Sequence, residues 1–209
     1  MKLTTMVTLV SVSVLLSACF GGAAKPVTVA QYDLGDVGNL GGSAKSDLNL
    51  PLRSVDVHAP SWLSKATMQY RLAYADAGRR DAYTESRWAA APGELLEVSL
   101  RRRLGLVDEA GDSAGCRLRV ELDEFVQVFD SAQQSRAVIA ARLAVQAPRS
   151  DEVLARKALQ LSKPTSSPDA RGGVAAFSSS AIEIGNEAGL WLAALAKDQP
   201  ALIKRCRAK

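Results

Sequence analysis

Apolar and polar residues alternate along much of the chain, and this period of two predicts β-strands. Four short candidates come first, and turn residues at 77–80 join the last two of them into a hairpin. Three longer candidates follow and are predicted to form an antiparallel meander with one face in solvent. The candidates are 29–34, 52–57, 68–74, 81–86, 117–130, 135–146 and 152–161. Glu124 interrupts the apolar positions of the fifth candidate, so a β-bulge is expected near Asp123 or Glu124.

Helical spacing predicts two helices. The first begins at Pro92, carries Arg101–Arg103 in its last turn and ends near Gly105, an order that suits the helix dipole. The second opens at Ser167-Pro168-Asp169 and repeats apolar residues at intervals of three and four, which gives a stripe able to cover a sheet. The stripe comprises Val174, Phe177, Ala181, Ile184, Ala188, Trp191 and Leu195.

These elements predict an α+β fold, with an antiparallel or mixed sheet of six or seven strands and two helices packed on one face. The expected domain spans 29–197 and is followed by a C-terminal tail at 198–209. Gly172, Gly173, Gly185 and Gly189 fall near or inside the last helix. Glycine at these positions would allow the helix backbone to approach the sheet or a neighbouring element closely. For Gly172 and Gly173 the alternative is that the helix starts after them.

The N-terminus has the pattern of a lipoprotein signal peptide. Lys2 precedes a short apolar segment that ends in Leu16-Ser17-Ala18-Cys19, a box that resembles the processing site of bacterial lipoproteins. This resemblance implies that Cys19 is acylated and becomes the first residue after cleavage of 1–18. Residues 19–28 would form the lipidated tether. Phe20 follows the Cys, where the resemblance to enteric lipoproteins implies that an Asp would retain the protein in the inner membrane, so the outer membrane is expected. The alternatives are an ordinary cleaved signal with a coincidental Cys, or an apolar N-terminus that stays attached.

Charge does not indicate nucleic-acid binding. The full chain has a formal net charge of +4, and loss of Lys2 with the signal leaves +3 over 191 residues. The basic residues are not gathered into a cluster of the kind that nucleic-acid binding requires. A protein exported to the envelope is also less suited to such a role.

Two cysteines remain beyond the lipidation site. Cys116 and Cys206 would lie in a compartment where disulfides persist, so they form either a bridge or two unpaired thiols. A bridge would close a loop of about 90 residues and stabilise the fold by roughly 4 to 5 kcal/mol.

Five segments in order resemble the ABC-type transport auxiliary lipoproteins, the PqiC-like family. The resemblance runs from about residue 30 to residue 196. The segments are Ser54–Leu63, Met68–Arg71, Tyr83–Pro92, Phe125–Phe129 and Asp169–Val174.

This resemblance implies an outer-membrane lipoprotein that assists an MCE-domain, tunnel-forming system by docking. The implied cargo is phospholipid or another hydrophobic molecule. The implied partners are the MCE-domain protein of the same system, the outer membrane through the N-terminal lipid, and further copies of the chain as a homo-oligomer. The alternative is a structural or assembly lipoprotein of another outer-membrane complex. The family supplies no catalytic motif and no cofactor.

Aromatic and cationic residues interleave in the first half of the chain. Trp, Tyr and Arg are enriched at interface hot spots, so these side chains are candidates for a partner-docking surface. The alternative is that the rings belong to the core and the arginines extend over them. The candidates are Trp62, Tyr70, Arg71, Arg87 and Trp88, with Tyr83 among the same rings.

Catalysis and metal binding are not expected. His58 is the single histidine, so a Ser-His-Asp triad would have to use it, and its place at the end of a strand before Ala59-Pro60 favours a structural role. One histidine with two separated cysteines does not supply a metal site either. The sequence therefore predicts a binding protein rather than an enzyme.

Overall fold

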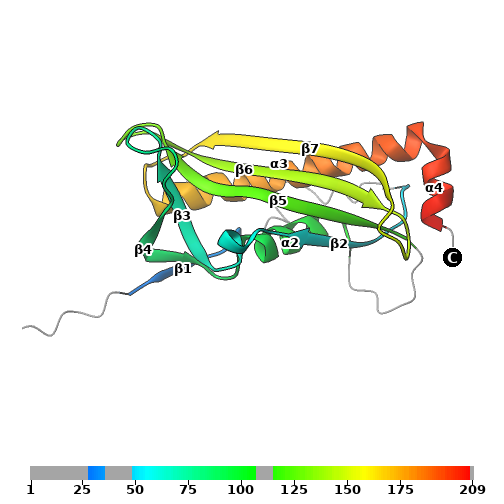
Figure 1. The fold of residues 1–209 in the computed structure, drawn as a ribbon, viewed down its shortest axis with the longest axis horizontal. Coiled ribbons are helices and arrows are strands. Elements are labelled where there is room, and N and C mark those ends of the chain that lie inside the picture. Colours follow the sequence, from blue (N-terminus) through cyan, green and yellow to red (C-terminus); the bar gives the residue numbers. More distant parts are fainter. Residues whose placement is uncertain (1–27, 36–48, 107–114, 208–209) are drawn as a thin grey trace, which may run out of the picture.

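The computed structural model describes residues 28–35, 49–106 and 115–207. Within these ranges, seven strands and three α-helices form an open α+β fold (Figure 1). The strands are β1 (Ala30–Tyr32), β2 (Leu52–His58), β3 (Thr67–Leu72), β4 (Asp81–Trp88), β5 (Cys116–Phe129), β6 (Ser135–Gln146) and β7 (Val153–Pro164). The helices are α2 (Pro92–Arg103), α3 (Ala170–Asp198) and α4 (Pro200–Arg207), with a 3-10 turn, η2, at Ser61–Leu63.

The sheet is mixed and has the order β1-β4-β3-β5-β6-β7. The predicted hairpin and meander are confirmed, because β3–β4, β5–β6 and β6–β7 pair antiparallel. Three further pairs are parallel, namely β1–β4, β2–β5 and β3–β5. The long strand β5 pairs with β2 along its first half and with β3 along its second half.

The predicted bulge is confirmed at the centre of β5. The register with β6 shifts between Leu122 and Glu124. Before the shift, Leu118, Val120 and Leu122 point into the core, and after it Phe125 does so. The extra residue therefore restores the inward direction of the apolar positions and leaves Glu124 on the opposite face.

Helices α2 and α3 cover one face of the sheet, and α3 runs along much of its length (Figure 1). The predicted stripe of α3 is confirmed as the buried face, with Phe177, Ala181, Ile184 and Ala188 at most 1% exposed. Asp169 caps this helix, since its carboxylate accepts a hydrogen bond of 2.7 Å from the Gly172 amide. We call the uncovered side of the sheet the outer face. It carries mostly polar side chains, apart from a small apolar cluster of Val126, Val128 and Val138 against Ala73.

The third helix, α4, lies where a tail was expected. Leu202 is 5% exposed and Cys206 is 0% exposed, so this short helix packs against the domain. Its eight residues are too few to be stable alone. The long-range contacts of these two side chains, which local sequence does not reveal, explain its presence.

A buried polar network lies where α3 begins. Gln127 is fully buried; its Nε2 donates to Ser135 Oγ at 2.9 Å and to the Asp169 carbonyl at 3.1 Å. Its Oε1 accepts from the Tyr83 hydroxyl at 3.1 Å. Gly173 sits directly above this amide, because a Cβ there would lie 2.2 Å from Gln127 Oε1. Of the two explanations for the glycines, close backbone approach is therefore the correct one at Gly173, which lies inside the helix.

We expect Gly173→Ala to lower the free energy of unfolding by about 1 to 3 kcal/mol, because Gln127 must move or α3 must lift from the sheet. The measurement is urea unfolding followed by circular dichroism. The matched control is Gly78→Ala, where the nearest atom to the new Cβ lies at 3.5 Å, an ordinary contact. Equal midpoints for the two variants would contradict the close-packing argument.

Candidate docking surface

The structure separates the predicted docking residues. Trp88 is 1% exposed and packs edge-on against Phe125 and Phe177, with ring centroids 5.5 Å apart in both pairs. Its assignment to a docking surface is therefore wrong, and the core alternative is correct for this ring. Tyr70 lies on the same inner side, since it stands beside Gln127 in the β3–β5 register.

Tyr70 and Tyr83 form a half-buried aromatic pair, with ring centroids 4.9 Å apart. Burial raises the pKa of Tyr83 well above its ordinary value, and the Asp169 carboxylate and Tyr70 raise it further. The Tyr83 hydroxyl therefore stays protonated and serves as the donor to Gln127. This pair supports the core network around Gln127.

Four other side chains meet on the outer face around Glu124. Arg71 Nη2 lies 2.8 Å from Glu124 Oε2, and Arg80 Nη2 lies 2.8 Å from Glu124 Oε1. The Arg80 guanidinium also lies over the Trp62 ring, 5.9 Å from its centroid. Gln69 connects the two sides, donating to the Trp62 carbonyl at 2.6 Å and accepting from Arg80 Nη1 at 3.1 Å. We call these five residues, Trp62, Gln69, Arg71, Arg80 and Glu124, the Glu124 cluster.

The Glu124 cluster holds an exposed aromatic ring in a fixed place. Trp62 is 53% exposed, while the side chains of Arg71, Arg80 and Glu124 are only 19–27% exposed. One carboxylate between two guanidiniums leaves a net positive charge next to the ring. A partly buried Arg pair that orients an exposed Trp has the chemistry of an interface hot spot.

Sequence reasoning found Trp62 and Arg71 and missed Gln69, Arg80 and Glu124 as their partners. The sequence did mark Glu124 as unusual, since this residue interrupts the apolar pattern of β5, but from that interruption we predicted only the bulge and no ion pair. Arg80 lies at the end of a turn and gave no signal. Arg87 is exposed and lies elsewhere, opposite Gln31 in the β1–β4 register.

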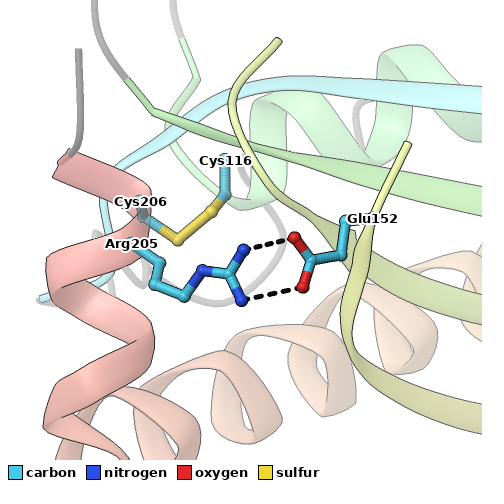
Figure 2. The surroundings of a disulfide bond; sticks show 4 residues. All are labelled: Cys116, Glu152, Arg205 and Cys206. Atoms are coloured by element: carbon cyan, nitrogen blue, oxygen red, sulfur yellow. Dashed lines mark hydrogen bonds and ion pairs between the residues drawn. A yellow bond between two sulfur atoms is a disulfide. The ribbon is translucent and has the colours of Figure 1, made fainter. Parts of the chain in front are cut away.

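The two remaining cysteines lie apart from this cluster, at the start of β5 and in α4. Cys116 and Cys206 are joined by a disulfide, with their Cα atoms 4.8 Å apart (Figure 2). Next to the disulfide, Arg205 of α4 forms a bidentate ion pair with Glu152 (Figure 2). Arg205 Nη1 donates to Glu152 Oε1 at 2.8 Å, and Nη2 donates to Oε2. This hydrogen bonding lowers the pKa of Glu152. We call these four residues the C-terminal clasp.

Cys19, the predicted lipidation site, lies outside the described residues, as does the signal peptide at 1–18. In the part of the chain that the structure describes, no helix is long and apolar enough to cross a membrane. The described side chains also include no group of three or more His, Cys, Asp or Glu residues arranged to hold a metal ion.

The described residues form an open-faced α+β domain with an exposed aromatic ring beside two arginines. The chain is a member of the ABC-type transport auxiliary lipoprotein component family, whose model matches residues 32–187. The expected family membership and α+β fold are thus confirmed. Membership supports a role in a transport system with partners and a lipid-anchored place in the cell envelope; the family is not an enzyme family.

Solved structures share the fold at low sequence identity. A crystal structure of a Xanthomonas campestris protein matches with a TM-score of 0.62 and 18% identity, covering 72% of this chain and 88% of that one. A second crystal structure, of an uncharacterized protein, matches with a TM-score of 0.60 and 13% identity, covering 79% and 99%. No curated protein sequence matches.

Proposed function

We propose that this protein is an outer-membrane lipoprotein, anchored through Cys19 and facing the periplasm, that docks the MCE-domain component of a lipid transport system. The proposed cargo is phospholipid or another hydrophobic molecule. The family match over residues 32–187 carries the proposal, since it makes the chain an auxiliary component of an ABC-type transporter. The sequence at Leu16–Cys19 supports the anchor.

Docking suits the physical problem of lipid transport. Each methylene exposed to water costs about 0.8 kcal/mol, so a lipid needs a covered path between the two membranes. Such a path must be held at the far membrane by a protein that stays there. Three acyl chains on Cys19 would supply a permanent anchor.

The Glu124 cluster is the proposed contact for the MCE-domain partner. Its exposed Trp62 would bury a large apolar ring, and Arg80 would keep its stacking and ion pair in the complex. A homo-oligomer would repeat this contact around the end of a tunnel, which is the form of assembly that we propose. No catalytic step is required of this chain.

The test is an affinity pull-down of the tagged, lipidated protein from crosslinked envelopes, read by mass spectrometry. We expect an MCE-domain protein among the recovered partners. We expect Trp62→Ala to reduce its recovery at least about tenfold, because loss of a hot-spot aromatic typically costs about 2 kcal/mol or more, which is roughly thirtyfold in affinity. The matched control is Tyr74→Ala, which removes a ring of similar exposure, 54%, outside the cluster.

Two results would count against the proposal. Recovery of other outer-membrane assembly factors alone would favour a structural or assembly lipoprotein with no transport role. Equal recovery with Trp62→Ala and the wild type would remove the Glu124 cluster from the interface while leaving the pathway intact.

A further inference from the structure

The outer face of β5, β6 and β7 contains a hollow lined by arginines. Its volume is about 530 Å³, and none of the described helices lies over this side of the sheet. Two small residues, Ala144 and Ala158, line it together with Arg119, Arg142 and Arg156, and the Glu121 carboxylate that pairs with Arg119 is also part of the lining. We call the two alanines and three arginines the arginine hollow.

The strand register explains how the hollow forms. Ala144 of β6 stands between Arg119 of β5 and Arg156 of β7, so two arginines flank one methyl group across three strands. Neighbouring strands are about 4.8 Å apart, which puts the Cα atoms of those two arginines about 10 Å from each other. In the next row Arg142 faces Ala158. Long cationic side chains around short apolar ones leave a space with guanidinium groups at its rim.

The hollow carries more positive than negative charge. Arg119 Nε lies 2.6 Å from Glu121 Oε1, and Arg142 Nη2 lies 2.6 Å from Asp123 Oδ1. Each of these guanidiniums has further N–H groups beyond the ones that its carboxylate uses. Arg156 is exposed and makes no hydrogen bond or ion pair with any other residue that the structure describes. The lining thus offers N–H donors to an anion, and the Arg156 guanidinium is available to bind it without breaking an existing ion pair.

The backbone around the hollow favours a compact anion over a peptide. Strands β5 and β6 are interior strands, paired on both sides, so their backbone groups are already used. An extended peptide lying here would find side chains only, without the backbone partners that it needs. A phosphate group needs only N–H donors, and guanidinium matches its geometry well.

We propose that the arginine hollow binds the phosphate of an anionic phospholipid headgroup. The inference rests on the proposed place of the protein at a membrane, where a lipid anchor keeps headgroups at high local concentration. It does not depend on the identity of the docked partner. Headgroup binding and capture of an MCE-domain protein are separate measurements, so each can fail while the other holds.

The experiment titrates the full-length lipidated protein, in a neutral detergent, with short-chain phosphatidylglycerol by isothermal calorimetry. We expect saturable binding that weakens as salt is raised, and at least about tenfold weaker binding of phosphatidylcholine, in which the cationic choline offsets the phosphate. Arg156→Gln should weaken phosphatidylglycerol binding about tenfold through loss of a charge-assisted contact. Ala144→Leu should weaken it as much, because it fills the hollow without changing its charge.

The matched control is Arg171→Gln, which removes the same charge from an exposed position at the start of α3. Equal losses from Arg171→Gln and Arg156→Gln would mean general charge attraction and would overturn the site. Equal binding of the two lipids by the wild type would overturn it as well. Equally tight binding of glycerol phosphate would mean that the ligand of the hollow is a free phosphate anion and not a lipid headgroup. Displacement of the lipid by an acidic peptide at low concentration would identify a protein partner instead. Should Ala144→Leu fail to fold by circular dichroism, Arg156→Gln decides alone.

Discussion

Replacing both Cys116 and Cys206 by Ser is expected to lower the free energy of unfolding by about 4 to 5 kcal/mol. The bond spans 90 residues, so it removes a large loop-closure entropy from the unfolded chain. It also holds α4, an eight-residue helix that is too short to be stable by itself, against the start of β5. The measurement is urea unfolding of the wild type and the double variant under oxidising conditions.

Reductant provides the internal control for this prediction. It should shift the unfolding midpoint of the wild type toward that of the double variant and leave the double variant unchanged. Alkylation should label both thiols of the unfolded wild type only after reduction. Labelling of both thiols in unreduced protein, or a midpoint that does not respond to reductant, would contradict a stabilising bond.

Glu152→Gln separates the two parts of the C-terminal clasp. The ion pair with Arg205 is exposed, with 50% and 53% of the two side chains accessible, so water screens it. We therefore expect a change much smaller than that from losing the disulfide. Urea unfolding of this variant should show that the disulfide and the packing of Leu202, rather than the ion pair, hold α4 in place.

Local pattern predicted those parts of the fold that depend on neighbouring residues. The meander, the hairpin, the bulge before Glu124 and the buried stripe of α3 all follow from spacing within one segment or two consecutive ones. The parallel pairs β2–β5 and β3–β5 were not predicted, because they join strands separated by other elements. Helix α4 was missed for the same reason, since its stability comes from Leu202 and Cys206 in contact with distant residues.

The candidate docking surface shows the same limit at the level of single side chains. Trp62 and Trp88 are equally suited to an interface by composition, and only the tertiary structure distinguishes them. Trp62 lies on a 3-10 turn that leads onto the outer face, whereas Trp88 ends β4 on the face that α3 covers. Likewise, Arg80 became a partner of Glu124 only because β3 pairs with the second half of β5.

Trp88→Ala is expected to lower the free energy of unfolding by about 3 to 5 kcal/mol, whereas Trp62→Ala should change it by less than about 1 kcal/mol. Trp88 contacts two rings, Phe125 and Phe177, which stack on each other at 4.2 Å between centroids. Removing it leaves a cavity between the sheet and α3 that these rings cannot fill. Trp62 is 53% exposed, so its removal leaves no such cavity.

Urea unfolding of both variants, combined with the envelope pull-down, separates a structural role from a docking role. Trp88→Ala should lose stability, and where it still folds it should recover partners as the wild type does. Trp62→Ala should keep its stability and lose the partner. A stable Trp88→Ala variant would contradict the packing of the aromatic core. A strongly destabilised Trp62→Ala variant would mean that the Glu124 cluster supports the fold rather than a partner, because a docking residue contributes its energy only in the complex.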